Sequence, residues 1–78
     1  MKTTEITKDI IGKRVAGIFT AMSVTGTITE IWEDEYSKGV MIRLDHGVQW
    51  GEYTYTQYMS TARKSDGWGN LENTRLIN

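Results

Sequence analysis

The sequence predicts an all-β fold, a small five-stranded antiparallel barrel in which residues 1–78 form a single domain. Residue types that favour strands (Thr, Ile, Val, Tyr, Trp and Phe) make up 31 of the 78 residues, whereas Leu and Ala occur three times each. Short alternating segments are separated by polar, glycine-containing stretches, with no internal repeat or linker. Five short strands around one modest core favour closure, because closure removes exposed strand edges.

The first two expected elements are a short helical turn over residues 7–12 and a strand over residues 13–20. Thr7 is suited to cap the turn and Gly12 to end it. The strand alternates around Val15 and is bounded by residues 21–23, which we expect to form a connection.

The next expected strand covers residues 24–33 and is irregular. Ile28 falls on the inward face, between threonines that face outward. Ile31 and Trp32 break this alternation, which predicts a bulge near Glu30. The polar residues 33–39 then form a loop.

Residues 40–45 give the cleanest two-residue alternation in the chain and predict a third strand. Its inward residues are Val40, Ile42 and Leu44. Val48 and Trp50 join them on the core face only if Leu44 lies opposite Val48 and Ile42 opposite Trp50.

This register leaves Asp45-His46-Gly47 as a three-residue hairpin loop. Such a loop needs a left-handed residue at its third position, and Gly47 supplies it. The outward face then carries Arg43, Gln49, Tyr53 and Tyr55.

The remainder of the chain supplies the last two strands. Residues 52–64 favour a strand by propensity, although 57–63 also suit a helix by composition. Residues 65–67 form a turn, residues 71–74 a one-turn helix, and residues 75–77 a short final strand. Whether Trp32, Trp50 and Trp68 lie in the core or on the surface stays open.

Charge and composition exclude several classes of protein. Nine basic and ten acidic residues give a net charge of −1, which does not suit a general polyphosphate binder. Without cysteine and with one histidine, the chain offers no disulfide, no thiolate zinc site and no Cys/His metal cage. Residues 1–6 lack the apolar run of a signal peptide or membrane span, so we expect a soluble, cytoplasmic protein without metal or cofactor.

The outward residues Arg43, Gln49, Tyr53 and Tyr55 form the candidate binding surface. Tyrosine and arginine concentrate binding energy at the centres of protein interfaces. We therefore expect a non-catalytic interaction module that binds a protein partner or associates with itself. The alternative is that Trp50 and one or two of the tyrosines complete a small core.

A second hypothesis is sequence-tolerant nucleic-acid binding. The same aromatic side chains, together with Arg63 and Lys64, have the chemistry to stack bases and contact phosphates. This hypothesis predicts an affinity for oligonucleotides that falls as the salt concentration rises.

Other polar groups carry no recognisable chemistry. The acidic run Glu30, Glu33, Asp34 and Glu35 lacks the spacing of a calcium loop and is typical of a solvated loop. His46 beside Asp45 has no G-x-S-x-G motif to accompany it, and no G-x-G-x-x-G phosphate loop occurs. We expect no catalytic and no metal-binding residues.

The arrangement of turns resembles the SH3-like small barrels, from Gly12-Lys13-Arg14-Val15 to the final strand Arg75-Leu76-Ile77. Those segments, together with Gly26-Thr27-Ile28, Asp45-His46-Gly47-Val48-Gln49 and the terminal Asn78, are also similar to plasmid-encoded type II dihydrofolate reductase. That resemblance implies a homotetramer whose central pore binds folate and a nicotinamide cofactor through a Val-Gln-x-Tyr strand. Val48 and Gln49 match this motif, but Gly51 stands at the tyrosine position, and residues 52–70 form a stretch that the family lacks. A fold of this kind hosts many unrelated functions.

Overall fold

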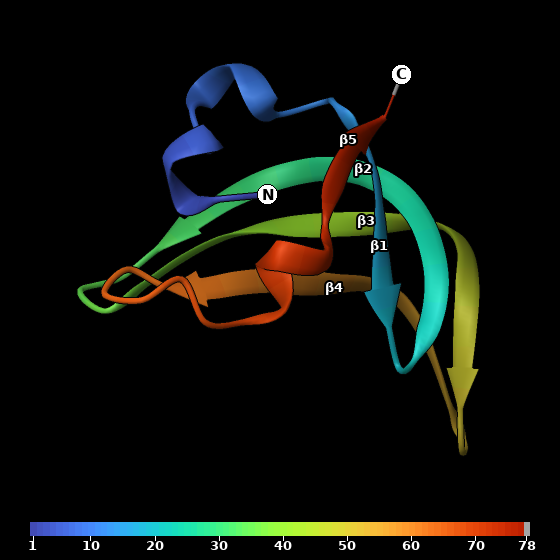
Figure 1. Cartoon of the computed structure of the whole chain (residues 1–78). Coiled ribbons are helices and arrows are strands. Elements are labelled where there is room, and N and C mark those ends of the chain that lie inside the picture. The colour runs from blue at the N-terminus through green and yellow to red at the C-terminus, as the bar shows by residue number, and fades with distance from the viewer. Residues whose placement is uncertain (78) are drawn as a thin grey trace.

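The computed structural model describes residues 1–77 and shows one five-stranded antiparallel sheet with strand order β4-β3-β2-β1-β5 (Figure 1). Three single-turn 3₁₀ helices accompany the strands. In chain order the elements are η1 (Thr3–Glu5), η2 (Lys8–Ile10), β1 (Arg14–Phe19), β2 (Met22–Glu33), β3 (Ser37–Trp50), β4 (Tyr53–Arg63), η3 (Asn70–Asn73) and β5 (Arg75–Ile77). The predicted all-β class is therefore confirmed.

Several local predictions are confirmed at their residues. The turn after Thr7 and the last strand lie where the sequence places them, and residues 57–63 are strand, not helix. Residues 21–23 do not form the expected connection, because β2 already begins at Met22. Instead, Thr20 and Ala21 form a two-residue turn in which both have positive φ, 51° and 62°. Asn78 lies outside the described residues.

The core is formed by the inward side chains of the central strands. Val40, Ile42 and Leu44 are buried, as the alternation predicts, and Ile28 opposes Ile42 across β2 and β3. The predicted bulge is present, with a register shift between Ile28 and Glu30. It lets one long strand keep its apolar residues packed on both sides of the bend.

The predicted hairpin loop over Asp45-His46-Gly47 is wrong. These residues lie inside β3, which runs on to Trp50, and the turn is formed by Gly51 and Glu52 between Trp50 and Tyr53. Gly51 has the positive φ of 63° that such a turn requires. Gly47 instead allows the two strands of the hairpin to pack closely, since a Cβ at this position would lie 2.9 Å from Cγ2 of Thr54.

This correction changes the partners of the predicted core residues. Ile42 pairs with Tyr58, not Trp50, and Val48 pairs with Tyr55, not Leu44. Val48 and Tyr58 are buried, whereas the side chains of Trp50 and Trp68 are exposed and Trp32 is intermediate. Tyr58 thus takes the place opposite Ile42 that the predicted register gave to Trp50, and the side chain of Trp50 lies on the surface.

Closure of the sheet into a barrel is not confirmed. β4 and β5 lie at the two ends of the strand order, and within residues 1–77 no pairing joins them. η3 precedes β5 and packs against both β4 and β1. No helix among the described residues is long and apolar enough to cross a membrane.

Candidate functional site: a projecting hairpin arm

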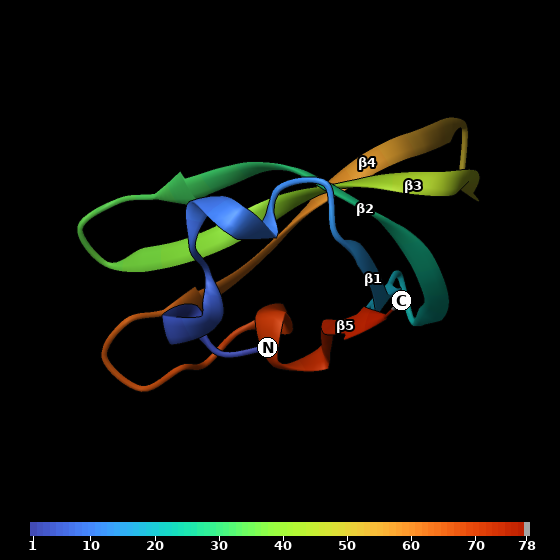
Figure 2. The ribbon, with the colours of Figure 1, turned by 90° about the horizontal axis from the view of Figure 1, so that it is seen from above.

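The sheet separates into two hairpins at the point where β3 stops pairing with β2. Pairing of β2 with β3 stops at Gly26 and Leu44, whereas β3 continues beside β4 from Val48 to the turn. Figure 2 shows the β1–β2 and β3–β4 hairpins separating from each other at this point. We call the projecting end of the second hairpin, residues 46–57, the distal arm.

The bend at the base of the arm follows from an irregularity in β3. Between the pairs Arg43–Gln57 and Val48–Tyr55, four residues of β3 oppose a single residue of β4. Extra residues in one strand bend it and increase its twist, so the arm turns away from the rest of the sheet.

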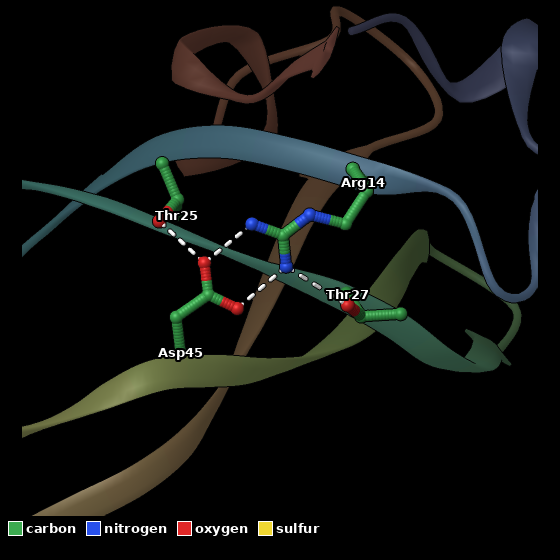
Figure 3. A network of polar contacts seen from close by, with 4 residues as sticks. All are labelled: Arg14, Thr25, Thr27 and Asp45. Atoms are coloured by element: carbon green, nitrogen blue, oxygen red, sulfur yellow. Dashed lines mark hydrogen bonds and ion pairs between the residues drawn. The ribbon is translucent and has the colours of Figure 1, made fainter. Parts of the chain in front are cut away.

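An ion pair fixes the base of the arm to the other two strands (Figure 3). Nη1 of Arg14 on β1 donates to Oδ1 of Asp45, and Nη2 donates to Oδ2, both at 2.5 Å. The hydroxyl of Thr25 on β2 also donates to Oδ2, at 2.6 Å, and Nη1 of Arg14 donates to Thr27 at 3.2 Å. Asp45 thus links β3 to β1 and β2 where the pairing of β2 with β3 ends.

These contacts hold Asp45 as a carboxylate. The hydrogen bond from Arg14, followed by that from Thr25, lowers the pKa of Asp45 well below its usual range, and Asp45 raises the pKa of Arg14 in return. A carboxyl group whose pKa is lowered by folding stabilises the fold fully above its unfolded pKa of roughly 3.9, and this stabilisation is lost as the pH falls below it.

We therefore expect acid to weaken the base of the arm. The free energy of unfolding of the native chain, measured with urea between pH 5 and pH 2, should fall more steeply than that of Asp45→Asn, which lacks the titrating group. Asp9→Asn, at an exposed aspartate outside the network, should keep the native pH dependence. Equal slopes for the native chain and Asp45→Asn would contradict the assignment.

One face of the arm is aromatic. Val48 and Trp50 on β3 oppose Tyr55 and Tyr53 on β4, and side chains two residues apart share a face. The exposed fractions are 60% for Trp50, 71% for Tyr53 and 39% for Tyr55. Trp50 and Tyr53 thus lie at the tip of the arm, and Tyr55 lies beside the buried Val48 nearer its base.

The base of this aromatic face is anchored in the domain. The ring of Phe19 meets Tyr55 edge-on at 5.4 Å between centroids and stacks on Tyr58 at 4.7 Å. Such contacts stabilise by about 0.5–1.5 kcal/mol beyond area burial. Tyr55 is therefore held in place, while Trp50 and Tyr53 remain free to contact another molecule.

The predicted binding residues are all exposed, but they do not form one surface. Gln49 opposes Thr54, so it lies on the opposite face of the arm from Tyr53 and Tyr55. Arg43 lies on the main sheet before the bend, where it pairs with Thr27 on β2 and with Gln57, the residue at the base of the arm. Sequence reasoning missed Trp50, because the incorrect register placed it in the core, and Asp45, because it placed that residue in a loop.

The outer edge of β4 differs between its two halves. Near Arg63 it is covered: the side-chain oxygen of Asn70 accepts from the Thr61 amide at 2.8 Å, and its nitrogen donates to the Met59 carbonyl at 3.2 Å. The Arg63 amide donates to the carbonyl of Trp68 at 2.9 Å. Along Tyr53–Gln57, no other segment of residues 1–77 forms a hydrogen bond to this edge. This half, which we call the open edge, belongs to the distal arm.

The basic residues of the nucleic-acid hypothesis lie at the other end of β4. Arg63 is paired with Asp66 at 2.5 Å and lies over the ring of Trp68 at 5.1 Å, and Lys64 is paired with Glu33 at 2.6 Å. The hydrogen bond from Lys64 lowers the pKa of Glu33. The structure thus does not bring these cations together with Tyr53 and Tyr55.

The structure also places His46 and the acidic loop. A groove of about 550 Å³ lies between the diverging hairpins and includes His46, but the neighbouring Asp45 is occupied by Arg14 and Thr25. In the acidic loop, Asp34 accepts from the amides of Tyr36 and Ser37 and so shapes the turn. Within residues 1–77, no group of three or more His, Cys, Asp or Glu side chains is placed to hold a metal ion.

Fold and site together define a small all-β domain with a projecting, aromatic hairpin. The chain belongs to a family described as a domain of unknown function (DUF7258), whose model matches residues 1–76. No curated protein and no solved structure matches the chain.

Proposed function

We propose that the protein is a non-catalytic interaction module whose contact surface is the distal arm. One observation carries this proposal: Trp50 and Tyr53 oppose each other at the tip of the arm and are 60% and 71% exposed. Aromatic side chains of this size contribute strongly to the binding energy of protein interfaces. Leaving their apolar surface exposed to water is unfavourable. Their position at the tip of the distal arm, whose base is anchored to the rest of the sheet, favours recognition of another protein surface.

The construction of the arm supports this role. Its base is fixed by Asp45 and by the packing of Phe19 on Tyr55, so little conformational freedom is lost when the tip binds. Its tip carries one charged side chain, Glu52, at the turn. An uncharged aromatic surface with a charge only at its rim is typical of the centre of a protein interface.

Tyr36 offers a matched control for a test in the producing cell. It is 72% exposed, against 71% for Tyr53, but it lies in the loop between β2 and β3, away from the arm. A photo-crosslinking amino acid at position 53 should join the chain to a specific protein, and the same group at position 36 should not. The captured protein is then purified and its affinity for the chain measured.

Tyr53→Ala is expected to weaken binding of that protein about thirtyfold or more, because truncating a hot-spot residue costs at least about 2 kcal/mol of binding free energy. Tyr36→Ala should change the affinity less than twofold, and both variants should stay folded by circular dichroism. Identical cross-linked products from the two positions, or an unchanged affinity in folded Tyr53→Ala, would overturn the proposal.

A further inference from the structure

The open edge of β4 lacks the usual protection of an edge strand. Exposed strand edges in soluble proteins are normally covered, charged, bulged or interrupted by proline. The Asn70 side chain covers the half of β4 near Thr61, but nothing in residues 1–77 covers Tyr53–Gln57. From Tyr53 to Ala62 the strand has no charged residue, no proline and no glycine. The open edge is thus suited to accept a further strand.

We propose that this added strand is the same edge of a second copy of the chain, paired antiparallel across a two-fold axis that passes through Tyr55. The inference rests on the proposed role of the arm and names its partner. The open edge is five residues long, and only the register centred on Tyr55 pairs all five of them. An interface of this kind uses the same surface on both copies and closes on itself as a dimer.

The side chains brought together in this register are compatible. Tyr53 lies opposite Gln57, Thr54 opposite Thr56, and Tyr55 opposite its own copy, so no like charges meet. Tyrosine pairs and threonine pairs across neighbouring strands each stabilise a sheet. The uncharged sequence therefore complements itself.

The loop that carries Asn70 and covers the Thr61 half of the β4 edge does not obstruct the pairing. In the register centred on Tyr55, Met59 of each copy falls opposite Gly51 of the other, beyond the first residue of β4. The loop that carries Asn70 then lies past the tip of the opposing arm. Both halves of the β4 edge are covered in the dimer, one by Asn70 and one by the second copy.

Two double variants with the same number of substitutions test the register. In T54K/T56K each lysine lies opposite a lysine of the second copy, so like charges oppose at both pairs. In T54K/T56E each lysine lies opposite a glutamate, so opposite charges meet. Both positions are exposed, and circular dichroism with urea unfolding checks that each variant is folded.

The measurement is the solution mass of the full chain by size-exclusion chromatography with light scattering, over about a hundredfold range of concentration. The native mass should rise from that of one chain towards that of two, T54K/T56E should follow it, and T54K/T56K should dissociate at least ten times more readily. A native mass of one chain throughout, or equal behaviour of the two variants, would overturn the inference.

The two proposals fail separately. If the native chain stays monomeric while cross-linking at position 53 still captures a different protein, self-pairing is wrong and the contact role of the arm stands. If neither self-pairing nor capture occurs, both are wrong.

Discussion

Ile42→Ala is expected to remove a large share of the free energy of unfolding. Ile42 has no solvent-exposed surface and lies between Ile28 on β2 and Tyr58 on β4, at the centre of the sheet. Removing its outer carbons should cost about 2–5 kcal/mol in lost burial and residual cavity. A domain of this size has a total stability of roughly 4–12 kcal/mol, so the loss is a large share of it.

Ile18→Ala is the matched control for this substitution. Ile18 is also a strand isoleucine, in β1, but it is 46% exposed. Its truncation should cost no more than about 1 kcal/mol, mainly through lower strand propensity. Urea unfolding followed by tryptophan fluorescence measures both variants, and equal losses would mean that Ile42 is not central to the core.

Gly69→Ala is the second substitution with a large expected effect. Gly69 has φ of 152°, which residues with a side chain rarely adopt, and a Cβ there would lie 2.2 Å from the Thr61 carbonyl oxygen. The backbone of residues 66–70 must therefore move away from β4. We expect a loss of about 3 kcal/mol or more, together with loss of the Asn70 cover on β4.

Substitution of Gly67 in the same loop separates the effect of positive φ from that of the close approach to β4. It also has positive φ, 75°, but a Cβ there would meet no atom within 4 Å. Gly67→Ala should therefore show only the left-handed backbone penalty of about 1–2 kcal/mol. If chemical unfolding gives the same loss for both variants, the close approach of Gly69 to β4 does not matter for stability.

The sequence predicts those parts of the fold that depend on local pattern. Alternation places Val40, Ile42 and Leu44 inside, the break at Ile31 and Trp32 reveals the bulge in β2, and strand propensity identifies β4. Each of these features depends on neighbouring residues along one strand, which a single sequence displays.

The hairpin could not be predicted in the same way. Gly47 and Gly51 are both plausible turn glycines, and the regular register together with the chemistry of a three-residue loop favours Gly47. The structure instead inserts an irregularity in β3, where four residues oppose one, and this changes which side chains share a face. A non-local irregularity of this kind leaves no mark in the alternation of either strand.

The candidate site was predicted only in part for the same reason. Tyr53 and Tyr55 are exposed on the arm, as expected, but Trp50 joins them and Gln49 does not. Asp45 and Asn70 act through contacts with strands distant in sequence, so their types alone do not reveal their roles.

Hydrogen–deuterium exchange of the full chain at low and high concentration tests the role of the open edge most directly. We predict that amides within Tyr53–Gln57 exchange more slowly at high concentration, because a second copy covers them. Amides of Thr61 and Arg63, already bonded to Asn70 and Trp68, should exchange at the same rate at both concentrations. Exchange of Tyr53–Gln57 that does not change with concentration would contradict the account.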